Sequence, residues 1–150
     1  MRKILPSFTI LFGVLFLISA CSSADSDTAK AQKIVDYNKQ KFNNLPLSGK
    51  IIDGARVIEV KGSQYEWSPD NIVVKKGEKI ILIIESTDVP HGFEIEGIVI
   101  PGWNPDNLIS KGQKVTLEFT PEEAGVWNTV CSGYCGPGHV GMKRNFIVRE

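Results

Sequence analysis

The chain is short of the side chains that most enzymes use for catalysis. It has only two histidines among its 150 residues, and its 17 Lys and Arg residues balance 17 Asp and Glu residues. This balance excludes the strongly basic surface that is typical of nucleic-acid-binding proteins. No glycine-rich phosphate loop precedes a helix, and no Ser-His-Asp set for hydrolysis is present. The sequence therefore offers no catalytic residue, and it leaves open whether the chain belongs to an enzyme.

Sulfur and imidazole donors are also few, but most of them gather in one short loop. The loop holds two of the three cysteines, one histidine and the only methionine besides the first residue: Cys131, Cys135, His139 and Met142. The second histidine, His91, lies upstream. Thiolate, imidazole and thioether groups are the donors that favour copper. The spacing therefore predicts a copper site built around this loop.

A single copper ion would need only one of these two cysteines as a ligand. A mononuclear blue-copper site uses two His, one Cys and a weak axial Met, which leaves Cys131 as a surplus thiolate. Two thiolates this close in sequence can each bridge two metal ions, with one imidazole for each ion. Met142 is then one weak donor, and the backbone carbonyl of Gly133 is the other candidate. The residues therefore favour two copper ions over one.

Three simpler interpretations compete with copper. The two loop cysteines could form a structural disulfide, since exported proteins often contain one, but a disulfide leaves the His and Met at ligand spacing unexplained. Zinc is the second alternative, although Met is not among its usual ligands. Buried structural histidines are the third, and this interpretation requires a coincidence at both positions.

The motif and its surroundings closely resemble the CuA domain of cytochrome c oxidase subunit II. That family carries Cys-x3-Cys-x3-His-x2-Met and an upstream His, which this chain matches at Cys131, Cys135, His139, Met142 and His91. Three further segments are similar to the family: residues 86–93 around the first histidine, the Ile-Pro-Gly of residues 100–102, and the aromatic segment of residues 64–67. The resemblance covers roughly residues 56–149.

The resemblance implies a mixed-valence centre of two copper ions. It implies that this centre accepts one electron from a cytochrome c or a similar donor. In that family the aromatic segment is implicated in receiving electrons, which makes Trp67 and Tyr65 candidates here. Trp103, just after the Pro-Gly pair, is a further candidate for an exposed aromatic.

The chain departs from the family at Gly133. Many subunit II proteins carry Glu between the two cysteines, where the backbone carbonyl binds copper and the carboxylate reaches a second metal at the interface with subunit I. Gly133 keeps the carbonyl but lacks the carboxylate. The side chain for that additional metal is therefore missing here.

The N-terminal residues have the layout of an export signal. Basic residues precede an apolar run over residues 4–20, which has about the minimum length for spanning a bilayer, and Cys21 follows. Residues 18–21 resemble a bacterial lipoprotein box, which implies that residues 1–20 are cleaved off and that Cys21 is lipidated. The alternative is an uncleaved transmembrane anchor. Both place a membrane-attached domain on the periplasmic or extracellular side.

The rest of the chain is predicted to form a tether followed by one domain. Residues 21–55 are expected to be the tether, with a short helix over residues 29–42. Residues 56–150 contain short β-branched runs between turn signals, which predict an all-β sandwich or barrel. The resemblance narrows this to a cupredoxin-like Greek-key β-sandwich. The predicted strands span residues 56–60, 71–75, 79–85, 113–119, 126–130 and 145–149.

The leading hypothesis is an electron-transfer protein that serves as subunit II of a haem-copper terminal oxidase, taking electrons from cytochrome c and passing them to haem in subunit I. One alternative is a stand-alone lipoprotein that carries or delivers copper. Another is a CuA electron carrier for nitrous or nitric oxide reduction. The lipoprotein box and Gly133 favour the alternatives, whereas the match around His91 favours the oxidase.

Overall fold

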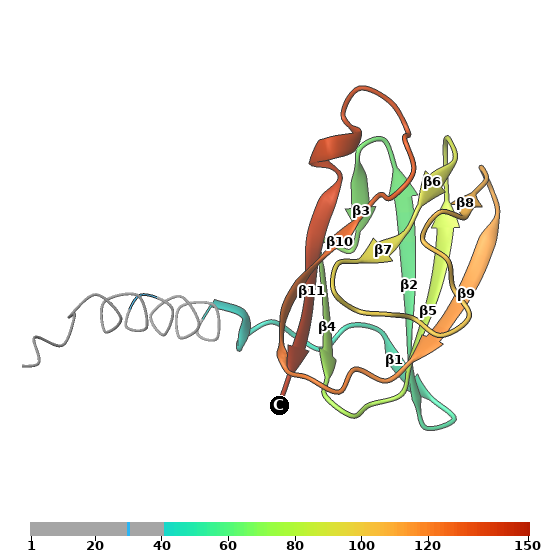
Figure 1. Cartoon of the computed structure of the whole chain (residues 1–150). Helices are drawn as coiled ribbons and strands as arrows, with labels where there is room; N and C mark the ends of the chain where they lie inside the picture. Colours follow the sequence, from blue (N-terminus) through green and yellow to red (C-terminus); the bar gives the residue numbers. More distant parts are fainter. Residues whose placement is uncertain (1–29, 31–40) are drawn as a thin grey trace, which may run out of the picture. The chain divides into compact units, whose positions relative to one another are not determined.

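Two β-sheets pack face to face in the computed structural model, which describes residue 30 and residues 41–150 (Figure 1). The first sheet has the strand order β1 (Lys50–Ile52), β2 (Ala55–Ser63), β5 (Ile80–Ser86) and β9 (Lys114–Phe119), with β3 (Glu66–Ser68) also paired to β2. The second has the order β4 (Asn71–Lys75), β11 (Lys143–Arg149), β10 (Gly125–Val130) and β7 (Glu94–Ile95). A separate pair joins β6 (His91–Gly92) to β8 (Leu108–Ile109).

The prediction of an all-β sandwich is confirmed. Each of the six predicted strands is present, with bounds that differ by a few residues at most. Most neighbours are antiparallel, but β2 pairs with β5 and β4 pairs with β11 in parallel. Two strands that are parallel neighbours cannot be joined by a tight hairpin, so the chain crosses to the other sheet between them. These crossing connections link the two layers.

The side chains of strand β5 are less buried than its sequence pattern predicts. Its continuous apolar run predicted burial on both faces. The side chains of Ile80, Leu82 and Ile84 are fully buried between the sheets, but Ile81 and Ile83 are only half-buried. A sheet in a two-layer sandwich, such as this mixed one, has one face toward the core and one toward solvent. The expectation of two buried faces was therefore wrong for this strand.

The compact fold includes residues that the sequence placed in the tether. Phe42 is buried against Val73 and Ile147, and the guanidinium of Arg149 donates hydrogen bonds to backbone carbonyls of residues 43 and 45. Strand β1 then pairs with β2 as a hairpin. The domain therefore begins before the predicted boundary at residue 56, because these contacts depend on distant partners that periodicity does not reveal.

The predicted signal, the lipidation site Cys21 and most of the predicted helix over 29–42 lie outside the described residues. Within the part of the chain that the structure does describe, no helix is long and apolar enough to cross a bilayer.

The strands bring the predicted ligands to one end of the sandwich (Figure 1). Strands β10 and β11 are paired up to Val130 and Lys143, and the loop that holds the four C-terminal ligands joins them. A backbone hydrogen bond from Cys131 N to Met142 O, at 3.3 Å, closes the base of this loop. His91 arrives on β6, and it is fully buried.

Candidate metal centre

Two sulfur atoms lie at the middle of the site. Cys131 and Cys135 are both buried, and their Sγ atoms are 3.6 Å apart. A disulfide requires a separation of about 2.05 Å, and both cysteines are free thiols. The two sulfurs therefore remain available as a pair of metal donors.

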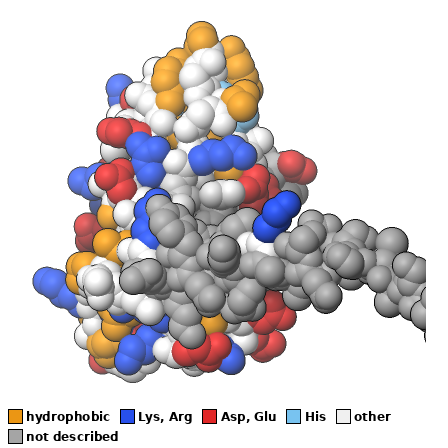
Figure 2. Space-filling view, turned by 90° about the vertical axis from the view of Figure 1, so that its left-hand side faces the viewer, with side chains coloured by type: hydrophobic (Ala, Val, Ile, Leu, Met, Phe, Trp, Pro, Cys, Tyr) orange, Lys and Arg blue, Asp and Glu red, His pale blue; other side chains and the backbone are white. Residues whose placement is uncertain are grey.

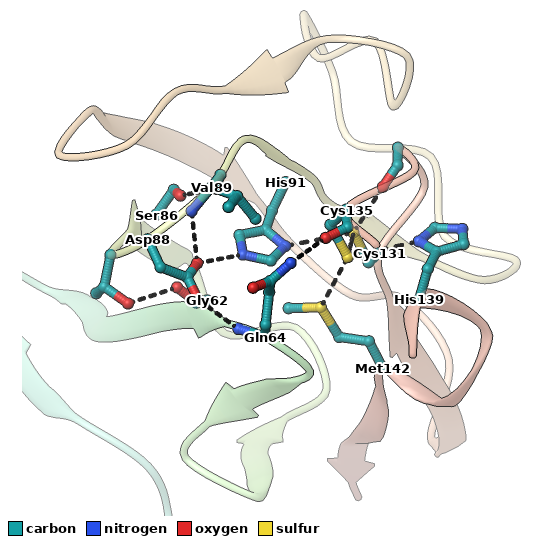
Figure 3. Close-up of polar contacts among 12 residues, drawn as sticks. Gly62, Gln64, Ser86, Asp88, Val89, His91, Cys131, Cys135, His139 and Met142 are labelled. Carbon is teal, nitrogen blue, oxygen red and sulfur yellow. Dashed lines mark hydrogen bonds and ion pairs between the residues drawn. The ribbon is translucent and has the colours of Figure 1, made fainter. Parts of the chain in front are cut away.

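One imidazole stands beside each sulfur. His91 Nδ1 lies 3.6 Å from Cys131 Sγ, and His139 Nδ1 lies 3.7 Å from Cys135 Sγ. Figure 3 shows the two rings on opposite sides of the sulfur pair. The donor atoms of His91, Cys131 and Cys135 all fall within 4.8 Å of one another. The arrangement has an approximate two-sided symmetry, with one Cys and one His on each side.

Each sulfur also has one weaker donor nearby. Met142 Sδ lies 3.8 Å from Cys135 Sγ, and the Gly133 carbonyl oxygen accepts a hydrogen bond from the Cys131 thiol at 3.0 Å. The structure thus brings together all six groups that the sequence singled out. Their chemistry fits copper, since soft sulfur donors combined with imidazoles select this metal. Among the described residues, no Asp or Glu belongs to this cluster, whereas calcium and magnesium are bound mainly by oxygen ligands.

The site is continuous with the hydrophobic core. Met142 and His91 are completely buried, and the cysteines pack in the same cluster as Phe93. His139 is the only one of the two histidines that reaches solvent. Burial, together with the contact to Cys131, raises the pKa of the Cys135 thiol to about 11. Metal binding therefore has to displace a proton from this group.

A carboxylate hydrogen-bonds the ring nitrogen of His91 that is turned away from the sulfurs. Asp88 Oδ1 lies 2.8 Å from His91 Nε2, and Asp88 also accepts hydrogen bonds from the backbone N–H groups of Gln64 and Val89, both at 2.7 Å. Partial burial acts to raise the pKa of Asp88, but these hydrogen bonds outweigh it and leave the pKa below its ordinary value. An ionised Asp88 can only accept this hydrogen bond, so His91 donates it from its Nε2–H group and the Nδ1 lone pair of the neutral ring faces the sulfurs.

Known proteins with a similar sequence include oxidase subunits and, at lower identity, nitrous-oxide reductases. The chain is 33% identical over 86 residues to cytochrome c oxidase subunit 2 of Thermus thermophilus, a match that covers 57% of this chain and 60% of that one. It is 36% identical over 85 residues to quinol oxidase subunit 2 of Sulfolobus acidocaldarius, covering 54% of this chain and 44% of that one. No protein-family model matches the chain. The chain spans about half the length of these relatives.

A solved structure has a similar fold. A chain from a haem-copper terminal oxidase dimer superposes with a TM-score of 0.53 at 18% identity, over 84% of this chain and 97% of that chain. The two-Cys, two-His, Met set is therefore found on the expected sandwich. The described residues form a cupredoxin-like sandwich, and their ligand set is similar to that of the CuA domain of oxidase subunit 2. These similarities support copper binding and electron transfer.

The three aromatic residues predicted to receive electrons occupy different places in this domain. Trp67 is 1% exposed, and its ring packs edge-on against His91, at a centroid distance of 5.9 Å, and against Phe93, at 5.2 Å. Trp67 therefore offers almost no surface to a partner protein, and its role in electron entry stays a prediction. Trp103 is half-buried and donates from Nε1 to the Phe93 carbonyl at 2.8 Å.

Tyr65 instead lies directly on the ligand loop and is half exposed. A Cβ atom added at Gly138 would lie 2.3 Å from Tyr65 Cδ2, and one added at Gly136 would lie 2.5 Å from the Tyr65 hydroxyl. The tyrosine ring therefore rests against glycine backbone, where no side chain fits. Gly136 also has a φ of +130°, which favours glycine.

Two residues of the site were missed from the sequence, namely Asp88 and Gln64. The signal for Asp88 was its position three residues before His91, and aspartate often orients a metal-bound imidazole. Gln64 gave no signal, because its contacts depend on how the β2–β3 turn folds over the ligand loop.

Proposed function

We propose that the CuA domain holds a dinuclear copper centre and serves as the electron-accepting subunit II of a haem-copper terminal oxidase. The ligands proposed are the thiolates of Cys131 and Cys135, the imidazoles of His91 and His139, the Met142 thioether and the Gly133 carbonyl. The observation that carries this proposal is the sulfur pair at 3.6 Å with one imidazole nitrogen beside each sulfur. A single copper ion would leave one thiolate without a role.

The protein contributes a rigid and dry set of donors. Paired strands fix both ends of the ligand loop, and four of the ligand side chains are buried. When bound, two copper ions sharing one electron supply a carrier whose bond lengths change little between oxidation states. Side chains already held in place by packing and hydrogen bonds lower the rearrangement that accompanies each transfer.

The surface beside His139 suits contact with a redox partner. The loop from Cys131 to Met142 contains no Lys, Arg, Asp or Glu. Figure 2 shows hydrophobic side chains gathered at one end of the domain, with a histidine at the edge of the group. The exposed apolar residues there are Leu108, Tyr134 and Val140, and the Tyr134 ring lies 5.9 Å from the His139 ring. A partner can approach this ligand without removing charged groups from water.

The donor is proposed to be a cytochrome c or a similar protein, and subunit I is the proposed acceptor. One relative is named cytochrome c oxidase subunit 2 and another quinol oxidase subunit 2, so relatives with this domain serve oxidases with different donors. The proposed location is the outer side of the cytoplasmic membrane, with attachment through a lipid on Cys21 or through an uncleaved apolar segment. Two or more acyl chains would anchor the domain firmly.

A second function, copper delivery by a stand-alone lipoprotein, is favoured by one observation. Gly133 has no side chain to reach toward a second subunit, and the methyl Cδ2 of Leu108 fills the place where a Cβ atom would be, at 2.2 Å. The conventional metal-bridged contact with subunit I is therefore not available to this chain. A copper carrier requires the same ligands but releases the metal readily to an acceptor.

Copper stoichiometry and paramagnetic resonance test the proposal. The copper-loaded domain should bind two copper ions per chain, and its spectrum should show one unpaired electron coupled equally to two copper nuclei. A four-line spectrum with one copper per chain would exclude the dinuclear centre. Rapid loss of both ions to an apo acceptor protein, together with no oxidation by purified oxidase subunit I, would favour copper delivery over electron transfer.

A further inference from the structure

Gln64 touches both halves of the metal centre. It lies in the turn between β2 and β3, and its backbone N–H donates to Asp88 Oδ2 at 2.7 Å. Its side-chain Nε2 donates to the backbone carbonyl of Cys135 at 2.5 Å. Figure 3 shows this residue between the aspartate side and the sulfur side of the site.

These contacts join two ligands that arrive on different elements. His91 hydrogen-bonds Asp88, Asp88 accepts from Gln64, and Gln64 donates to Cys135. His91 stands on a strand of only two residues that pairs with β8, outside both main sheets. Cys135 lies in the middle of the ligand loop, away from the paired ends of β10 and β11. Neither ligand is therefore fixed relative to the other by the sheets alone.

We infer that Gln64 is a positioning residue that sets the place of Cys135 relative to His91. This inference rests on the proposed copper function. The amide is well suited to the role, because it is neutral and presents an N–H donor to a carbonyl oxygen beside buried thiols. A carboxylate of the same shape would place oxygen against oxygen, and a thioether would leave the Cys135 carbonyl without this donor.

The Tyr65 ring extends the contact between the β2–β3 turn and the ligand loop. It covers Gly136 and Gly138, and the Gln64 Nε2 atom lies 2.8 Å from where a Cβ at Gly136 would be. The β2–β3 turn thus lies over the ligand loop as a lid of two side chains. Of these two residues, only Gln64 also contacts Asp88, through its backbone N–H, so its hydrogen bonds connect Cys135 with the carboxylate that holds His91.

The test compares Gln64→Met and Gln64→Glu with a matched control, Gln113→Met. Gln113 also makes a side-chain hydrogen bond, accepting from Ser110 N at 2.9 Å, but it contacts no proposed ligand. In the copper-loaded domain, Gln64→Met should lose copper to a Cu(I) chelator about tenfold faster than the wild type. It should also shift the reduction potential and the histidine nitrogen couplings. Gln64→Glu should be worse, and Gln113→Met should match the wild type.

A measurement on the metal-free domain separates this inference from the proposed function. The carbonyl ¹³C resonance of Cys135 should move in both Gln64 variants and stay in place in Gln113→Met. If that resonance and the rate of copper loss were unchanged in Gln64→Met, the positioning role would be overturned. The wild type could bind fewer than two copper ions while the Cys135 resonance still moves in the Gln64 variants. That result would contradict the dinuclear centre but support the hydrogen bond from Gln64 to Cys135.

Discussion

His91 is held between a carboxylate and a thiol. Its Nε2 atom lies 2.8 Å from Asp88 Oδ1, and its Nδ1 atom lies 3.6 Å from Cys131 Sγ. A neutral imidazole carries one proton, and an ionised Asp88 attracts it to Nε2. The ring is thereby fixed in the tautomer whose free lone pair points at the metal centre.

Replacing this carboxylate should loosen the histidine. Asp88→Ala removes the acceptor that selects the Nε2-protonated form, so we expect copper affinity to fall about 10- to 100-fold. Chelator competition measures the affinity, and ¹⁵N resonance of the His91 ring in the metal-free domain measures the tautomer. Asp70→Ala is the control, because Asp70 pairs with Arg144 on the surface and is 78% exposed. An unchanged His91 tautomer in Asp88→Ala would contradict this account.

Ligand substitutions should separate strong donors from weak ones. Cys135→Ser should abolish the dinuclear spectrum, whereas Cys131→Ser should leave a single blue-type copper bound by the remaining Cys, both His and Met142. Met142→Leu conserves volume in a buried position, so folding should change by less than about 1.5 kcal/mol. It should keep two copper ions and shift the reduction potential. Copper counting and voltammetry would expose a wrong assignment if Met142→Leu emptied the site while Cys131→Ser had no effect.

The sequence predicted those features of the structure that depend on residues close together in the chain. The ligand loop was predictable because its donors are close in sequence. Strand β4 was predictable from its run of β-branched residues, and β9 because its apolar residues repeat with the period of a strand. The roles of Gln64, Phe42 and Leu108 were not, since each depends on a partner far along the chain. The burial of Trp67 was not predictable for the same reason, because the sequence does not show whether an aromatic residue near a site is buried or exposed.

Electron acceptance should depend on Tyr65 rather than Trp67. Tyr65 is half exposed and lies on the ligand loop, so Tyr65→Ala should slow reduction by cytochrome c roughly fivefold, the effect of losing about 1 kcal/mol at an interface. Its copper spectrum should stay unchanged. Stopped-flow reduction measures this, with hexaammineruthenium(II) as a small reductant that should react with both forms equally.

Trp67→Ala should behave differently, because Trp67 fills the core beside His91. We expect a loss of about 3–5 kcal/mol of folding stability and an altered copper spectrum. If Trp67→Ala slowed cytochrome c alone while keeping stability and spectrum, the assignment of Tyr65 would be wrong.

The partly buried ion pair between Arg56 and Glu78 should make stability depend on pH. Arg56 Nε lies 2.7 Å from Glu78 Oε2, and this hydrogen bond holds the pKa of Glu78 below its ordinary value of 4.5. A carboxyl group with a lowered folded pKa contributes stability that is fully present above the unfolded pKa. That contribution is lost as the pH falls through the folded pKa, so acid should weaken the wild type below about pH 4.5.

Arg56→Met removes the partner and should cost about 2 kcal/mol at pH 7. The variant should also lose less additional stability on acidification than the wild type does. Urea unfolding of the metal-free domain at pH 7 and pH 4 measures both effects. The control is Lys79→Met, since the Lys79–Glu118 pair is about half exposed and should contribute less than about 1 kcal/mol. Equal acid sensitivity in Arg56→Met and the wild type would exclude the pair as the cause.

Position 133 can test whether glycine is required beside the two thiols. Gly133 does not have the positive φ that favours glycine, so its backbone tolerates other residues. The obstacle is steric, because an added Cβ would lie 2.2 Å from Leu108 Cδ2 and 3.3 Å from Gly92 N. Gly133→Glu alone should therefore displace Leu108 and weaken copper binding, whereas Gly133→Glu combined with Leu108→Ala should bind two copper ions as the wild type does, because the proposed ligand is the backbone carbonyl. Copper counting and paramagnetic resonance on the single and double variants decide this. A double variant that loses the dinuclear spectrum while remaining folded would show that the Gly133 carbonyl requires a backbone geometry that only glycine supplies.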